Sequence, residues 1–198
     1  MKRFKPMVEP ANFDARCRKR GRAWLKANPK YRRPRDYWSE FEPELRETFS
    51  NLCGYCVMLV IRGQVDHFVP VAILKKCKKD RKAYEWSNFR YGEGVINQRK
   101  SNHLVLDPFR VKDDWFEILL PSLQLVLTTA VPARQRKLAE FTIQCLGLRN
   151  SEVVIRYRKG FFDLYREGNL TIKGLEEVAP LIATAVRKDL ARGMDWRK

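Results

Sequence analysis

The sequence predicts an α+β fold, and three observations lead to this class. Residues 55–68 and 114–128 are rich in β-branched, aromatic and leucine side chains and contain turn residues, so each segment predicts two short strands. The flanking stretches repeat apolar residues every three or four positions, which is the period of an amphipathic helix. A length of 198 residues with 44% hydrophobic content suits one domain with its own core.

Residues 1–50 form the most basic part of the chain and are predicted to be helical. Asn12 or Asp14 is expected to cap a helix that runs to about Ala27, where Asn28 and Pro29 follow. A second, short helix is predicted over residues 43–51.

Residues 51–110 carry the residues of chemical interest. A turn at Arg62–Gly63 would divide residues 55–68 into two strands, with Asp66 and His67 at the end of the second. A helix over residues 96–102 would place Asn97 and Lys100 on one face, because they are three positions apart. Between these elements lies a basic patch that includes Lys75, Lys76, Lys78 and Lys79.

Residues 111–198 are predicted to form a hairpin, with its turn at Pro121–Ser122, and a helical scaffold. Ser151 and Thr171 are expected to begin two of the helices. The apolar period places the following residues on buried faces: Leu138, Phe141, Cys145 and Leu148, then Val154, Tyr157, Phe161, Leu164 and Tyr165.

The charge balance points to a polyanionic partner. The formal net charge is +17 and the pI is near 9.9, and such an excess is costly in self-repulsion. The alternative is a merely soluble basic protein. No apolar run reaches the length of a membrane span, the first residues lack a secretory apolar region, and five cysteines are scattered through the chain, so we expect a soluble cytoplasmic protein with reduced thiols and no membrane partner.

Asp66 and His67 have the chemistry of a hydrolytic site. A neutral imidazole is a competent base for water near pH 7, and a carboxylate beside it can face a cation. Neighbouring strand residues point to opposite sides, so the two can share a site only if the strand ends or bends there.

The segment VDHFVP, followed by WSNF and NQRKSN, closely resembles the HNH nuclease motif of the ββα-metal fold. It is similar to the HNH domain of Cas9-type nucleases and to small bacterial HNH proteins of phage-defence systems such as Septu. The resemblance covers about residues 50–110 and implies a ββα-metal HNH core embedded in N- and C-terminal helices. It also implies that the chain could be the nuclease component of a bacterial defence system.

The resemblance implies a role for each matching residue. His67 would be the catalytic base, and Asn88 would support the catalytic loop and orient His67. Asp66 and Asn97 would hold one divalent cation, Mg²⁺ or else Mn²⁺. Lys100 would neutralise a phosphate, or would be an ordinary exposed helix lysine.

The chain departs from the family in its zinc ligands. Many HNH proteins hold a structural zinc with two Cys-x-x-Cys pairs, and here Cys53 and Cys56 form only the first pair. Glu93 and Ile96 stand where the second pair would be, and an isoleucine cannot bind zinc. We therefore expect no structural zinc, with a site completed by Glu93, His103 or Cys77 as the alternative.

For His103 and Asp107 the sequence leaves both a functional and a structural role open. His103 either contacts the metal or a phosphate, or simply finishes a helix. Asp107, before Pro108, is either a turn residue or a further metal contact.

The sequence thus predicts a metal-dependent endonuclease that binds DNA through its basic residues and cleaves it. We also expect a partner protein that controls this activity. The alternatives are a catalytically silent nucleic-acid-binding module, a nuclease acting on RNA, and a purely structural subunit of a larger complex.

Overall fold

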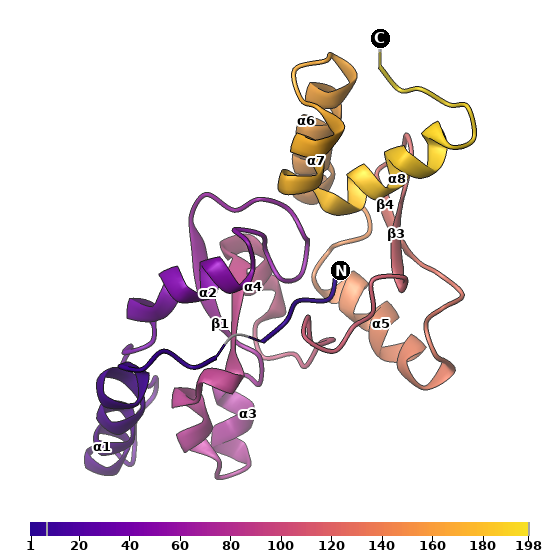
Figure 1. The fold of residues 1–198 in the computed structure, drawn as a ribbon. Helices are drawn as coiled ribbons and strands as arrows, with labels where there is room; N and C mark the ends of the chain where they lie inside the picture. Colours follow the sequence, from indigo (N-terminus) through magenta and orange to yellow (C-terminus); the bar gives the residue numbers. More distant parts are fainter. Residues whose placement is uncertain (7, 198) are drawn as a thin grey trace.

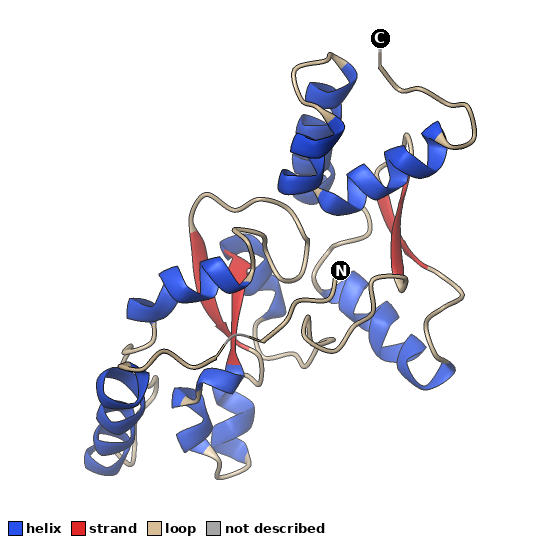
Figure 2. Cartoon of the chain, viewed as in Figure 1, coloured by secondary structure: helices blue, strands red, loops and turns tan. Residues whose placement is uncertain are grey.

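The computed structural model describes residues 1–6 and 8–197, and its fold is mixed α+β. Two small antiparallel sheets, each of two strands, lie among the helices α1 to α8 (Figure 2). Figure 1 shows the first sheet with α1–α4 in one part of the molecule, and the second sheet with α5–α8 in the other. No helix in these two ranges is long and apolar enough to cross a membrane.

The basic N-terminal region contains two helical stretches, with non-helical residues 28–38 between them. A π-helical segment, η1 (Asp14–Lys19), continues directly into α1 (Arg20–Ala27), and α2 spans Glu42–Thr48. The predicted cap is wrong, because the helix begins after Phe13 without a side-chain hydrogen bond at its first turn. Helix α1 lies close to the segment that follows α3: a Cβ on Gly21 would come within 2.2 Å of the Tyr84 ring.

The first sheet pairs two strands that are distant in sequence. Strand β1 (Gly63–His67) is antiparallel to β2 (Phe89–Glu93), and α4 (Gly94–Lys100) follows β2 at once. Between the strands lie α3 (Val71–Lys76) and the 3-10 segments η3 (Asp80–Tyr84) and η4 (Trp86–Asn88). The order of elements is therefore strand, strand, helix, with a 21-residue excursion between the strands.

The predicted hairpin within residues 55–68 is wrong in its first strand. Residues 53–58 form tight turns, and Val57 has a φ of 56° that a strand does not allow. The backbone of Leu59 and Val60 donates to Val178 and Asn51 instead of to β1. Residues 55–58 and Val60 are buried, whereas Leu59 and Ile61 are exposed, so the apolar composition of this run does not come from a strand.

The C-terminal region follows the prediction in its elements. Strands β3 (Phe116–Leu119) and β4 (Gln124–Leu127) form the predicted hairpin. The helices are α5 (Ala133–Cys145), α6 (Glu152–Arg166), α7 (Ile172–Val178) and α8 (Pro180–Leu190). The Thr171 hydroxyl caps α7 by accepting a hydrogen bond from the backbone N–H of Gly174, at 3.0 Å.

The buried faces of α5 and α6 differ from the prediction. Leu138 and Phe141 of α5 are 36% and 40% exposed, and Ala139, Thr142 and Ile143 are buried in their place. On α6, Tyr157 and Leu164 are exposed, whereas the charged Arg158 is 1% exposed. Arg158 is inward because its guanidinium donates to the Leu123 carbonyl at 2.8 Å and ties α6 to the β3–β4 turn.

Candidate active site around the first sheet

The register of the first sheet divides the predicted site residues between two faces. Asp66 lies opposite Arg90, and His67 lies opposite Phe89. Because side chains alternate along a strand, Asp66 and Arg90 point to one face and His67 and Phe89 to the other. Strand β1 stays paired through His67, so it does not bend in the way that would bring Asp66 and His67 together.

The Asp66 carboxylate is buried, and both of its oxygens are bonded. The Tyr55 hydroxyl donates to Oδ2 at 2.5 Å, and the Lys100 ammonium donates to Oδ1 at 2.9 Å. Burial, reinforced by the charge of Asp66, raises the pKa of Tyr55, so the phenol stays protonated and keeps donating. Lys100 is itself fully buried and donates also to the His67 carbonyl at 2.7 Å.

The burial of Lys100 agrees with neither expectation for it, a phosphate contact or an exposed helix lysine. Its side chain is 1% exposed, and its charge is taken by Asp66. Sequence spacing correctly placed it on the same face of α4 as Asn97, but that face packs on β1 instead of facing solvent.

Asn97 lies near the start of β1. Its amide nitrogen donates to the Gln64 side chain at 3.1 Å, while Lys100, one turn later, reaches Asp66. The two residues predicted to hold Mg²⁺ thus contact different partners. Within residues 1–6 and 8–197, no group of three or more His, Cys, Asp and Glu side chains is placed to hold a metal ion. The donor set does not fit the cation in this arrangement, because a cation at Asp66 would meet the Lys100 ammonium and the Tyr55 hydroxyl.

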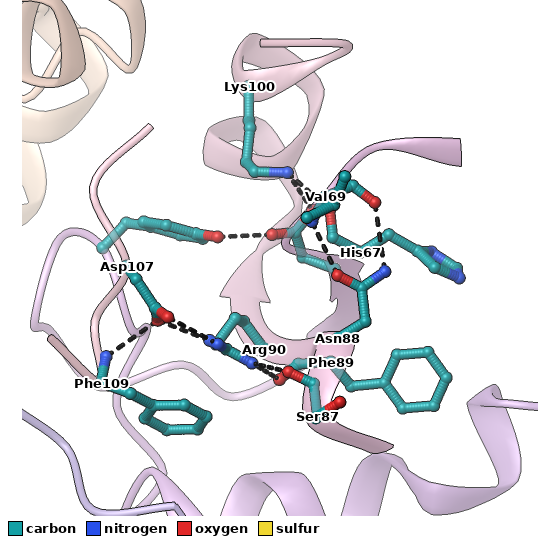
Figure 3. A network of polar contacts seen from close by, with 11 residues as sticks. His67, Val69, Ser87, Asn88, Phe89, Arg90, Lys100, Asp107 and Phe109 are labelled. Atoms are coloured by element: carbon teal, nitrogen blue, oxygen red, sulfur yellow. Dashed lines mark hydrogen bonds and ion pairs between the residues drawn. The ribbon is translucent and has the colours of Figure 1, made fainter. Parts of the chain in front are cut away.

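His67 lies on the other face of the sheet, with the geometry of a general base. Its Nε2 is 2.9 Å from the Ala83 carbonyl oxygen, an acceptor, so Nε2 carries the proton and Nδ1 carries the free lone pair. In the described part of the chain no group bonds to Nδ1. Figure 3 shows the ring pointing away from the Lys100 ammonium.

The surroundings keep this imidazole neutral and fixed. Burial is the main cause that lowers the pKa of His67 below its ordinary value of 6.5. The rings of Trp38 and Phe89 pack edge-on against it, with centroids at 4.5 and 5.3 Å. These two rings hold the imidazole in place, so that a neutral ring with one available nitrogen is present near pH 7.

Asn88 fastens the loop that follows His67. Its side-chain oxygen accepts from the Val69 N–H at 2.8 Å, and its nitrogen donates to the Val69 carbonyl at 3.1 Å. Its own carbonyl accepts from the N–H of Phe68 at 2.8 Å. Asn88 is thus bonded to Phe68 and Val69, the two residues that follow His67 (Figure 3).

Sequence reasoning missed the ion pair beside this loop. Arg90 donates two hydrogen bonds to Asp107, both at 2.8 Å, and the side chains are only 4% and 9% exposed. The Arg90 guanidinium lies over the Phe109 ring, 3.9 Å from its centroid. An arginine between the aromatic residues Phe89 and Tyr91 was the available indication, since a buried arginine requires a partner. Asp107 is the anchor of this pair as well as a turn residue, because Oδ1 accepts from the Phe109 N–H at 3.0 Å.

The cysteine pair lies in the core. Cys53 and Cys56 are free thiols, and the Cys53 sulfur accepts from the N–H groups of Tyr55 and Cys56 at 3.4 and 3.5 Å. Glu93 uses its carboxylate to cap α4 through Val95 and Ile96, and Ile96 is buried. His103 is exposed, with its ring against Phe141.

The lysines of the predicted basic patch reach solvent. Lys75, Lys76, Lys78 and Lys79 are all exposed at the end of α3 and just after it. Comparison of the chain with protein-family models, with curated proteins and with solved structures finds no match, so its function is inferred from this geometry.

Proposed function

We propose that this chain binds nucleic acid and hydrolyses its phosphodiester bonds, with the β1–β2–α4 unit acting as an HNH-type core and His67 as the general base. The observation that carries this proposal is the hydrogen bond between Nε2 of His67 and the Ala83 carbonyl at 2.9 Å. It selects the tautomer in which Nδ1 can take a proton from water.

Three further observations support it. The strand–strand–helix order agrees with the resemblance of residues 50–110 to HNH proteins. Asn88 clamps the loop after His67, which is the role the resemblance assigns to it. The net charge of +17 suits a phosphodiester substrate. DNA is the expected substrate, and RNA is the alternative that a side-by-side assay decides.

The two residues to which the resemblance assigns Mg²⁺, Asp66 and Asn97, make other contacts in the structure. Mg²⁺ at Asp66 and Asn97 remains a prediction, and with Asp66 bonded to Lys100 and Tyr55 we assign no step to it. The same contacts favour a second candidate function, a nucleic-acid-binding module without catalysis, because they use the carboxylate for folding.

A plasmid assay tests the proposal. Supercoiled DNA is incubated with the protein and Mg²⁺ or Mn²⁺, with EDTA as the metal control. His67→Gln is the informative variant, because its amide can still donate to the Ala83 carbonyl but it lacks a base. His103→Ala is the matched control, since His103 is the other histidine of the chain and is exposed.

We expect nicking by the wild type and by His103→Ala, and a loss of at least about 100-fold in His67→Gln, the usual size of a general-base contribution. Equal cutting by His67→Gln and wild type would refute the assignment of the base. Binding without cutting under every metal condition would select the silent module.

A further inference from the structure

A basic groove runs between α1 and the segment after α3. It has a volume of about 970 Å³ and is lined by α1 through Arg22 and Lys26, and by α3 through Lys75. The segment after α3 adds four more cations, Lys78, Lys79, Arg81 and Lys82. We call this surface the basic groove. Lys76 is exposed but does not line it.

The charge of the basic groove is largely uncompensated. Arg22 is paired with Glu85 at 2.6 Å, whereas the other six cations have no carboxylate partner within the described ranges. Lys75 donates to the Tyr31 carbonyl and lies over the Tyr31 ring, a contact that leaves its charge unneutralised. Asp80 is the one acidic residue of the lining, and it is turned to the Tyr31 hydroxyl, at 3.0 Å. Such a concentration of like charge is stable when a polyanion neutralises it.

The aromatic residues near the basic groove are engaged in packing. Tyr31 is 8% exposed and its hydroxyl is bonded to Asp80, and Trp24 packs edge-on against it with centroids at 5.5 Å. Tyr37 lies beneath the guanidinium of Arg20, 4.4 Å from its centroid. Sequence-independent binding of single strands relies on free aromatic faces on which bases stack. A lining of cations without such faces suits the phosphate backbone of a duplex.

The basic groove and the proposed base share one element. Segment η3 carries Arg81 and Lys82 into the groove, and its next residue, Ala83, accepts the hydrogen bond that orients His67. Gly21 allows α1 to approach η3 this closely, because any side chain there would overlap the Tyr84 ring. A nucleic-acid backbone bound in the groove would thus contact η3, the same short segment that positions the His67 imidazole.

We propose that the basic groove binds the phosphate backbone of duplex DNA without reading its sequence, and that α1 is therefore part of the substrate-binding surface. The role of the groove in guiding DNA to His67 rests on the proposed nuclease function, whereas the binding itself does not.

Fluorescence anisotropy with a labelled 20-base-pair duplex tests the binding. All proteins carry His67→Gln and are measured in EDTA, so cleavage plays no part. The groove variant replaces Lys26, Lys79 and Lys82 by Ala. These side chains are exposed and make no ion pair within the ranges described, so the variant is expected to fold.

The matched control also removes three positive charges, but away from the groove. It replaces Arg134 and Lys137 of α5 and Lys173 of α7 by Ala, and these three side chains are exposed as well. Circular dichroism verifies that both triple variants are folded.

We expect the groove variant to bind at least about tenfold more weakly at 0.1 M salt, and its plot of log K against log salt to be shallower by about 2.7, or 0.9 for each lost phosphate contact. In the control triple variant, the loss of affinity and the change of salt slope should each be no more than about a third of those in the groove variant. Equal losses in both triples would overturn the groove and indicate a diffuse charge effect. A single strand of the same length that binds as tightly as the duplex would overturn the duplex assignment, and so would tighter binding of duplex RNA.

Discussion

Replacing Lys100 by Met tests the buried contact that separates Asp66 from solvent. The side chains of the pair are 1% and 5% exposed, and the Nζ–Oδ1 distance is 2.9 Å. The substitution leaves a carboxylate in the core with only the Tyr55 hydroxyl as partner, and it leaves the His67 carbonyl without its donor. Breaking a buried pair from one side costs about 3–5 kcal/mol, a large fraction of the stability of a domain.

The double variant Asp66→Asn with Lys100→Met separates two costs of Lys100→Met: the loss of the Asp66–Lys100 attraction, and the burial of an unpaired Asp66 carboxylate. Asn still accepts from Tyr55, and no charge remains buried, so the double variant should be more stable than Lys100→Met alone. The coupling energy between the two sites should be about 2 kcal/mol or more. Lys79→Met is the matched control, because Lys79 is exposed and should change stability by less than about 0.5 kcal/mol.

Urea unfolding, followed by far-ultraviolet circular dichroism and by tryptophan fluorescence, measures these differences. If Lys100→Met lies within about 1 kcal/mol of wild type, or if the cycle gives no coupling, the reasoning is refuted, since the pair would then not be closed to solvent.

Burial lowers the pKa of His67 below 6.5, and this lowering should appear both in the cleavage rate and in the stability of the protein. The cleavage rate should fall on the acid side with a midpoint below pH 6.5, and a midpoint at or above 6.5 in a profile of kcat/KM against pH would contradict the burial of the ring. The stability that neutral His67 contributes should be complete above pH 6.5 and be lost as the pH falls below it, a slope that His67→Gln should remove in unfolding experiments. Asn88→Ala should cost about 1–3 kcal/mol, because it leaves both polar backbone groups of Val69 unpaired, and it should reduce cleavage more than duplex binding; unchanged stability would argue against the clamp. Arg90→Met should destabilise by about 3–5 kcal/mol by leaving Asp107 buried and unpaired, and a thermal unfolding midpoint equal to that of wild type would contradict this.

Much of the scaffold could be predicted locally. The helices of the C-terminal region, the β3–β4 hairpin and the Thr171 cap follow from apolar period and turn residues, which are properties of short segments. The strand expected before β1 failed because β1 pairs with β2, 21 residues later, while Leu59 and Val60 bond elsewhere. Composition records that a side chain will be buried, but not which backbone will lie beside it.

The candidate site shows the same division. The residue types and their order could be read directly from the chain: an imidazole with a carboxylate beside it, an Asn about twenty residues later, and an excess of cations. Long-range packing placed Asp66 and His67 on opposite faces of β1, put Lys100 in the core, and brought α1 and η3 together to form the basic groove. The physical reason is that these outcomes depend on strand register and on the pairing of buried charges, and both are settled between segments that are far apart in sequence.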